Sequence, residues 1–427
     1  MKKLVLGAML GASLLAMAST ASAAVEINIF GASAQNDYWN TAAPLYLAAP
    51  VANGGMGCDP ATVAKANRYY DKGGVWTKDK KMGIAKGDNC AGAGGDTVYI
   101  QYTAVASFEG PRSVYGVDPD NLDSCSDNPA YDDHYREMID ETSCDFAIGE
   151  CSAKACKDVT IGASDVAAES FTQSSTGCIN GHVDCSEVLD ISLTPDTIPT
   201  AGLDTYRPIV VPFRFFVSDN LATAGINNLT RLQAVLLFNG NVTNWSQFGP
   251  SYPNLGTVIC LRHAGSGTHA TLDKAVMRGD YPLASVQIVP PPFNPTGQVI
   301  YFNESSSNLM DCVNDLGGKS AATHGAVGYA DADKNAAGTW PNVVNVTYNG
   351  VDALQDHIKN GVYSFWSAQW IYEDPTEPNY AVTHPIVQSM MAYSSIAANI
   401  PASKAPYWVA KNDLNVTKGT DFVLPKF

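Results

Sequence analysis

The chain has 427 residues, of which 42 are acidic and 26 are basic, and its formal net charge is −16. An excess of negative charge this large argues against nucleic acid and anionic membranes as partners, because both would repel it. The length exceeds that of one typical domain, and an apolar fraction of 45% is enough to build two cores.

The first 23 residues have the pattern of a secretory signal peptide. Two lysines precede the apolar run Leu4 to Met17, and Ala21-Ser22-Ala23 fits a small-residue cleavage site. Removal of this segment takes the net charge from −16 to −18. No later apolar run is long enough to span a bilayer. We therefore expect an exported soluble protein, either periplasmic or secreted.

Ten cysteines in an exported chain predict disulfide bonds, although the sequence does not give their pairing. Their spacing lacks the paired pattern of structural zinc sites, and no haem-attachment motif is present, so we expect no cofactor and no metal. His134 and His182 lie in Cys-bearing stretches near acidic residues and are weak metal-ligand candidates, because isolated loop histidines usually bind nothing.

The N-terminal third alternates strands with loops of small residues. Glu26 to Phe30 predicts a strand, and Asn36 or Asp37 is expected to cap the helix that follows it. Residues 50–95 are Gly-rich, carry Cys58 and Cys90, and predict a loop-rich insertion that a disulfide holds in place.

A second insertion separates the next two predicted strands. Thr97 to Ala106 predicts a strand, and residues 111–157, which are polar and contain four cysteines, predict an irregular segment stapled by disulfides. Asp158 to Ile161 predicts another strand. A helix is expected over 166–171, with Asp165 at or near its cap.

The remaining chain continues the alternation of strands and helices, which indicates an α/β fold. Strands are predicted at Tyr206–Ser218, Thr257–Leu261, Val286–Val289, Gly325–Tyr329 and Ser364–Tyr372, and helices at Thr230–Phe238, His269–Arg278, Ser305–Leu316, Val351–Lys359 and His384–Ala398.

The segment Arg262–Thr268 joins a predicted strand to a predicted helix and has the composition of an anion-binding loop. Gly265 and Gly267 allow a tight turn close to a ligand, and Ser266 and Thr268 supply hydroxyl groups. Arg262 adds a planar fork of donors suited to a tetrahedral oxyanion. An ordinary Gly-rich turn beside a surface arginine is the alternative.

Several other strand ends carry small or hydroxyl-bearing residues. In open α/β sheets, ligands bind at the carboxyl ends of strands, often between two domains. Ser33, Ser107 and Asp165 are therefore predicted to share one cleft with the Arg262 loop.

Asp165 is the unexpected member of this set, because a carboxylate repels an anion unless a proton lies between them. Phosphate carries an ionisable proton near neutral pH and sulfate does not, so the carboxylate would accept a hydrogen bond from phosphate and repel sulfate. A helix cap is the alternative role of this residue.

Taken together, these segments resemble those of the periplasmic phosphate-binding proteins of ABC phosphate importers. Arg262–Thr268 is similar to that family's R-x-D-G-S-G-T signature, and Gly162–Asp165 to its G-A-S-D loop. Leu237–Trp245, Gly325–Tyr329 and Gly31–Ala34 resemble three further family segments, and all of them follow the family's order along the chain.

The resemblance implies a type II clamshell of two domains, with mixed sheets flanked by helices, Cys-bearing loop insertions, and phosphate in the hinge cleft. Domain 1 would hold residues 24–212 plus 361–427, and domain 2 residues 213–360. An ABC phosphate permease in the inner membrane is the implied partner, and the protein would act as a monomer. The implied phosphate ligands are Ser33, Ala34, Gln35, Ser107, Asp165, Arg262, Ser266, Gly267 and Thr268.

This sequence also departs from the family pattern. Ala264 replaces the aspartate that would brace the arginine, and Glu109 follows Ser107 where an acidic residue is unfavourable unless it points away. The cysteine-bearing insertions are atypical. Three functions therefore stay open: capture of phosphate, or of the similar anion arsenate, for import; a secreted phosphatase; and a surface or filament protein with an altered pocket. We expect a binding protein without catalytic residues.

Overall fold

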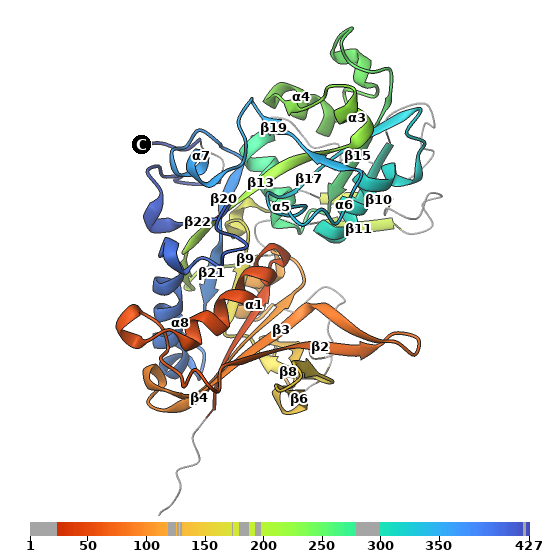
Figure 1. Ribbon diagram of the computed structural model, residues 1–427. Coiled ribbons are helices and arrows are strands. Elements are labelled where there is room, and N and C mark those ends of the chain that lie inside the picture. The colour runs from red at the N-terminus through yellow and green to blue at the C-terminus, as the bar shows by residue number, and fades with distance from the viewer. Residues whose placement is uncertain are drawn as a thin grey trace, which may run out of the picture.

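A computed structural model describes residues 24–117, 125, 128, 130–172, 174–178, 188–192, 198–278, 299–421 and 424–427, with the backbone alone described at 174–178 and 188–192. It contains two large mixed sheets flanked by helices, which confirms the predicted fold class (Figure 1). The predicted signal peptide, the strand predicted at Val286–Val289, and His182 lie outside the described residues.

The first sheet has nine strands in the order β12-β21-β9-β1-β4-β3-β2-β7-β6. At its centre β1 runs parallel to both β4 and β9, so the carboxyl ends of these three strands lie at one edge. We call this part of the molecule the first lobe. Its strands are β1 (Ala24–Gly31), β2 (Ala64–Asp71), β3 (Trp76–Cys90), β4 (Asp96–Ala104), β6 (Cys144–Asp145), β7 (Glu150–Cys151), β9 (Ile161–Ser164), β12 (Asp204–Tyr206) and β21 (Trp370–Glu373).

The second sheet has seven strands and builds the second lobe. Its order is β16-β15-β17-β13-β18, with β20 and β22 also paired to β13. β15 runs parallel to β16 and β17, which brings their carboxyl ends together. The strands are β13 (Ile209–Ser218), β15 (Gly256–Arg262), β16 (Val299–Asn303), β17 (His324–Asp331), β18 (Val343–Asn345), β20 (Trp366–Ala368) and β22 (Val409–Ala410).

Helices pack on both sheets and leave the carboxyl ends of the parallel strands to the loops. In the first lobe, α1 packs on β3 and β4, and α2 on β9. In the second lobe, α6 packs on β15 and β17. The helices are α1 (Ser33–Ala48), α2 (Glu109–Tyr115), α3 (Asp219–Thr223), α4 (Arg231–Phe238), α5 (Gly267–Thr271, continued by a π-helical turn over Leu272–Met277), α6 (Ser306–Asp315), α7 (Gln355–Lys359) and α8 (Tyr380–Ser394).

Three small two-stranded sheets complete the fold, namely β5 (Tyr135–Ile139) with β8 (Lys154–Asp158), β10 (Ser174–Cys178) with β11 (Val188–Ser192), and β14 (Asn228–Leu229) with β19 (Thr347–Tyr348).

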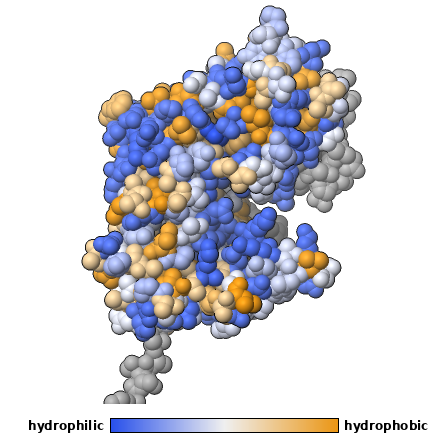
Figure 2. Space-filling model, viewed as in Figure 1, coloured by the Kyte–Doolittle hydropathy of each residue, from blue (hydrophilic) through white to orange (hydrophobic). Residues whose placement is uncertain are grey.

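Two short neighbouring stretches join strands of the first sheet directly to strands of the second, and we call them the crossing segments. Residues 207–208 join β12 of the first sheet to β13 of the second, and Gln369 joins β20, which pairs with β13, to β21, which pairs with β9. Figure 2 shows a notch between the two lobes on one side of the molecule, whereas the surface is continuous on the other. In the part of the chain that is described, no helix combines the length and hydropathy needed to cross a membrane.

The two insertions are more ordered than the sequence suggests. Residues 50–95 were predicted as loops, but β2 and β3 form an antiparallel hairpin that joins the first sheet. The Lys-rich start of β3, over 76–81, is exposed or half-buried on both faces, so it carries no apolar alternation to reveal a strand. The prediction of irregular structure over 111–157 is likewise wrong where β5 pairs with β8.

Four disulfides join cysteines in the described residues, and they confirm that both insertions are stapled. Cys58 bonds Cys90 in the first insertion, while Cys125 bonds Cys156 and Cys144 bonds Cys151 in the second. The fourth, Cys260 to Cys312, ties β15 to α6 in the core of the second lobe.

Four local predictions need correction. Helix α1 begins at Ser33, so neither Asn36 nor Asp37 is its cap. The strand predicted at 158–161 is two strands, because β8 ends at Asp158 and β9 begins at Ile161. The strand predicted at 364–372 is also two, since Gln369 separates β20 from β21. The helix predicted over 166–171 is a single 3-10 turn, Ala168–Ser170.

The disulfides give a test of the fold. A cross-link stabilises mainly by restricting the unfolded chain, and more so for a longer loop. Replacing Cys260 and Cys312, 52 residues apart, by alanine should lower the free energy of unfolding by about 4 kcal/mol. The same change at Cys144 and Cys151, only 7 apart, should cost about 2 to 3 kcal/mol. Urea denaturation of both double variants measures this, and an equal or reversed order would contradict the pairing.

Candidate anion-binding site

Arg262 lies at the end of β15, where the backbone and α6 hold its guanidinium in place. Nε donates to the carbonyl of Asn303 at 3.1 Å, Nη2 to that of Glu304 at 2.9 Å, and Nη1 to the Ser306 hydroxyl at 2.8 Å. The side chain is 1% exposed. The turn between β16 and α6 therefore braces the arginine, in place of the aspartate that Ala264 replaces.

This bracing leaves the charge of Arg262 without a direct counter-ion. Its three hydrogen-bond partners are neutral, and no ion pair in the described part of the chain includes it. Burial lowers its pKa, while Tyr329 and Asp331 act in the opposite direction. A buried guanidinium held only by neutral groups favours a nearby anion strongly.

The loop after Arg262 packs directly against loops of the first lobe. The Phe108 amide donates to the Gly265 carbonyl at 3.3 Å, and a Cβ on Gly265 would lie 2.3 Å from the Phe108 ring. A Cβ on Gly267 would lie 2.5 Å from Ser107 Oγ and 2.6 Å from Asp165 Cβ. Both glycines are therefore required by the contact between lobes.

Asp165 is fully buried and has spare hydrogen-bonding capacity. Ser107 Oγ donates to its Oδ2 at 3.1 Å, whereas Oδ1 has no partner in the described residues. Burial, and next the charge of Asp331, raise the pKa of Asp165 to about 7, although Ser107, Gln369 and Arg262 act to lower it. The predicted cap role is wrong, because the side chain faces Ser107 rather than the turn that follows it.

Two residues at this junction were not found from the sequence. Asp331, at the end of β17, is 6% exposed, its Oδ1 has no partner in the described residues, and burial raises its pKa. Gln369, in a crossing segment, is fully buried with an unpartnered Oε1. The rule that ligands gather at carboxyl ends of parallel strands would have found Asp331. Gln369 gave no signal, since it lies inside an apparently continuous strand.

The start of α1 supports a neighbouring turn, and its described hydrogen bonds do not point a side-chain donor at Arg262 or Asp165. Gln35 Nε2 donates to the Ser164 carbonyl at 3.0 Å, and its Oε1 accepts from Trp39 Nε1 at 2.9 Å. This residue therefore fixes the turn that carries Asp165. Ser33 is half-buried and Ala34 buried at the start of α1, and no described side-chain contact joins either of them to Arg262.

The other residues predicted in the Arg262 loop are all buried. Ser266 is 2% exposed and precedes α5 without capping it through its side chain, and Thr268 is 1% exposed. The contacts thus bring Gly267 onto Ser107 and Asp165, with Arg262 close enough to affect the pKa of Asp165.

The two histidines of this region are buried and neutral. His269 Nδ1 lies 2.6 Å from the Tyr329 hydroxyl, which accepts from the Arg262 amide at 3.0 Å. Burial, and then Arg262, lower the pKa of His269 to about 3, and the same two causes lower that of His263. Glu109 points away into an ion pair with Arg112 at 3.0 Å.

Residues 206–395 match a model described as a PBP superfamily domain, which confirms the sequence resemblance at the level of that superfamily. Similar solved structures include an ABC-type phosphate transport receptor from Vibrio cholerae, 21% identical, with 46% of this chain and 70% of that chain covered and a TM-score of 0.32.

Two further similar structures are a phosphate-binding protein from Stenotrophomonas maltophilia and the periplasmic phosphate-binding protein PfluDING. The former is 12% identical, with 61% of this chain and 78% of that chain covered and a TM-score of 0.40. The latter, solved with bound phosphate, is 13% identical, with 90% of each chain covered and a TM-score of 0.45.

The raised pKa of Asp165 predicts how stability depends on pH. The unfolded carboxyl ionises near 3.8 and the folded one near 7, so between these values the folded state holds more protons. The free energy of unfolding should then fall as pH rises from about 4 to about 7. Asp165→Asn cannot ionise, so its stability relative to wild type should grow by about 2 to 4 kcal/mol across this window.

Urea denaturation in phosphate-free buffer at several pH values measures this difference. Asp59→Asn is the control, because that aspartate is exposed and forms no ion pair in the described residues. Parallel stability profiles for wild type and Asp165→Asn would show that Asp165 ionises normally.

Proposed function

We propose that the protein captures inorganic phosphate between its two lobes and delivers it to an ABC permease in the inner membrane. The proposal rests on two buried groups at the junction, a cation and a carboxyl group. Arg262 supplies a positive charge with no direct counter-ion, and Asp165 supplies a carboxylate oxygen with no partner in the described residues. A proton-bearing tetrahedral anion satisfies both groups at once.

In this proposal the ligand set is Ser33, Ala34, Gln35, Ser107, Asp165, Arg262, Ser266, Gly267 and Thr268. Arg262 donates to the anion beyond the bonds that brace it, and the hydroxyls and amides of the surrounding loops share the remaining charge. Many donors are needed because a dehydrated phosphate left unpaired is very costly. The burial of the Arg262 loop supports a site that excludes water.

Asp165 gives the site its preference for phosphate. Its pKa near 7 lies close to the pH at which phosphate exchanges its second proton, so one proton is shared between carboxylate and ligand. Sulfate brings no proton, and its charge would face the carboxylate and Asp331. This arrangement rejects sulfate by an unpaired acceptor rather than by size.

Capture requires the lobes to separate, and the proposed hinge lies beside the crossing segments, near residues 212 and 360. The loops around Gly265 and Gly267 touch Phe108 and Ser107 across the junction, which supports a closed arrangement. Rotation at this hinge would separate these loops while β20 and β22 stay paired with residues 209–212 of β13. The proposed moving units are residues 24–212 with 361–427, and residues 213–360.

The first test is the choice of anion. Wild-type protein, dialysed free of phosphate, should bind phosphate with 1:1 stoichiometry in a calorimeter and should not bind sulfate. Arg262→Gln should weaken phosphate binding by at least about 100-fold, because it removes charge-assisted hydrogen bonds worth about 1.5–3 kcal/mol each. Arg231→Gln is a matched control in the same lobe, since Arg231 also donates to backbone carbonyls. Equal affinity of wild type and Arg262→Gln for phosphate would contradict the proposal.

The second test concerns selectivity. Asp165→Asn replaces the carboxylate by an amide that no longer repels a fully ionised anion. Its phosphate affinity should fall by about tenfold while sulfate binding becomes measurable, so the ratio of the two affinities drops by about 100-fold. Ser113→Ala is the control, because its buried hydroxyl donates to the Gly110 carbonyl away from the anion. Unchanged selectivity in Asp165→Asn would remove the carboxylate from the mechanism.

The same preparations separate capture from the two other functions considered. A phosphatase would hydrolyse 4-nitrophenyl phosphate, and Ser107 or Ser266 would be required for the turnover. The described hydrogen bonds offer Ser107 only Asp165 as a base, since His269 bonds Tyr329. A filament protein would sediment as an assembly and leave phosphate unbound.

A further inference from the structure

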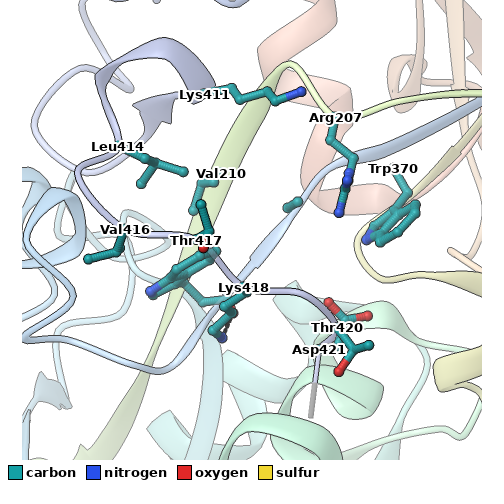
Figure 3. A pocket seen from close by; sticks show the side chains of 12 residues that line it. Arg207, Val210, Trp370, Lys411, Leu414, Val416, Thr417, Lys418, Thr420 and Asp421 are labelled. Atoms are coloured by element: carbon teal, nitrogen blue, oxygen red, sulfur yellow. Dashed lines mark hydrogen bonds between the residues drawn. The ribbon is translucent and has the colours of Figure 1, made fainter. Parts of the chain in front are cut away.

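A second cavity lies where the two crossing segments meet the C-terminal part of the chain. It has a volume of about 230 Å³ and shares no residue with the junction around Arg262. Arg207 comes from one crossing segment, Trp366 and Trp370 flank the other, and Lys418 and Asp421 come from the C-terminal stretch (Figure 3).

The two tryptophans present unused hydrogen-bond donors. The indole nitrogens of Trp366 and Trp370 are buried, and neither has a partner in the described residues. Trp366 as a whole is 2% exposed. An indole N–H only donates, and a buried tryptophan normally finds an acceptor for it. Both donors therefore call for a ligand that accepts hydrogen bonds.

Cations surround the same cavity. The Arg207 guanidinium lies 4.8 Å from the centroid of the Trp370 ring, and no hydrogen bond or ion pair of its side chain is found in the described chain. Figure 3 shows Lys411 extending toward Arg207 from the opposite rim. Lys418 Nζ donates to the carbonyls of Ser364 and Trp366, and burial lowers its pKa to about 7. Arg207 thus places a permanent positive charge at the cavity.

Asp421 is the acidic residue that lines the cavity, and both of its carboxylate oxygens already accept hydrogen bonds. Asp421 Oδ2 accepts from the Ala167 amide at 2.9 Å and the Ser170 hydroxyl at 2.6 Å, and Oδ1 accepts from Ser367 Oγ at 3.2 Å. The bonds from Ala167 and Ser170 anchor the C-terminal stretch to the first lobe, and the bond from Ser367 joins it to β20 of the second sheet. The carboxylate does not pair with Arg207, so the cavity keeps an excess of donors.

The rest of the lining is apolar. Val210, Leu414 and Val416 line it, together with the two indole rings. An inorganic anion would leave these surfaces without a partner, whereas an apolar group would bury them favourably. The volume is below the range of drug-sized sites, so the ligand has few atoms.

We propose that this cavity binds a small organic carboxylate with an apolar body, such as a single-ring acid. The carboxylate accepts from the indole N–H groups and faces Arg207, while the ring packs on Val210 and Leu414. A ligand here contacts residues of β20 and β21, which pair with the second and the first sheet respectively.

Benzoate is the probe, titrated calorimetrically into the mature wild-type protein at neutral pH. Saturable 1:1 binding is expected, weakened at least tenfold in Arg207→Gln and about fivefold in Trp370→Phe, which keeps a ring and removes the N–H. Acetate, which lacks the apolar body, and benzyl alcohol, which lacks the charge, should each bind at least tenfold more weakly than benzoate. Lys334→Gln is the matched control, because Lys334 also lies over a tryptophan, Trp340, but outside the cavity.

Two outcomes would overturn the proposal. One is benzoate binding that is absent, non-saturable, or equal in wild type and Arg207→Gln, provided the variant keeps the wild-type melting temperature. The other is benzoate that phosphate displaces competitively and that Arg262→Gln abolishes, since this would place benzoate in the junction between the lobes. The first result does not depend on whether phosphate itself binds, so the two proposals can fail separately.

Discussion

The structure depends on a buried positive charge that the protein holds with neutral groups alone. Two backbone carbonyls and one hydroxyl fix the Arg262 guanidinium at the end of β15, and they stabilise its position without cancelling its charge. A carboxylate in the place of Ala264 would have done both. By separating positioning from neutralisation, the fold keeps electrostatic attraction available for an anion at the junction of the lobes.

The opposite lobe places near this charge a carboxyl group, that of Asp165, whose pKa is raised. Asp165 and Asp331 both have raised pKa values, mainly because burial disfavours the ionised carboxylate, and the charge of Asp331 adds to the effect on Asp165. Gly265 and Gly267 make this approach possible, since any side chain there would overlap Phe108 or Ser107. The closeness of the lobes and the protonation of Asp165 are therefore linked consequences of the same packing.

Sequence patterns located the elements that a strong apolar period defines, including β1, β13, β15, α4 and α6. The patterns failed for a strand that is exposed on both faces and for a break between two strands that pair with different sheets. The β2–β3 hairpin reads as loop because its tip is polar on both faces, and the break at Gln369 is invisible because β20 and β21 are both apolar but pair with different sheets. For the site, composition identified Arg262 and Asp165, whereas Asp331 needed knowledge of strand direction and the bracing of Arg262 needed the β16–α6 turn.

The charged groups differ between the junction and the second cavity, which lies beside the crossing segments. At the junction, a cation and a protonatable carboxyl face each other, so the balance of charge changes with a single proton. At the cavity, the one lining carboxylate accepts from Ala167, Ser170 and Ser367, and Lys418 donates to two carbonyls, whereas the two indole donors have no partner in the described residues. The bonds from Ala167 and Ser170 tie the C-terminal stretch to the first lobe, whereas the bond from Ser367 and the pairing of β22 with β13 tie it to the second sheet. The C-terminal residues thus connect the two sheets beside the segments at which the chain crosses between them.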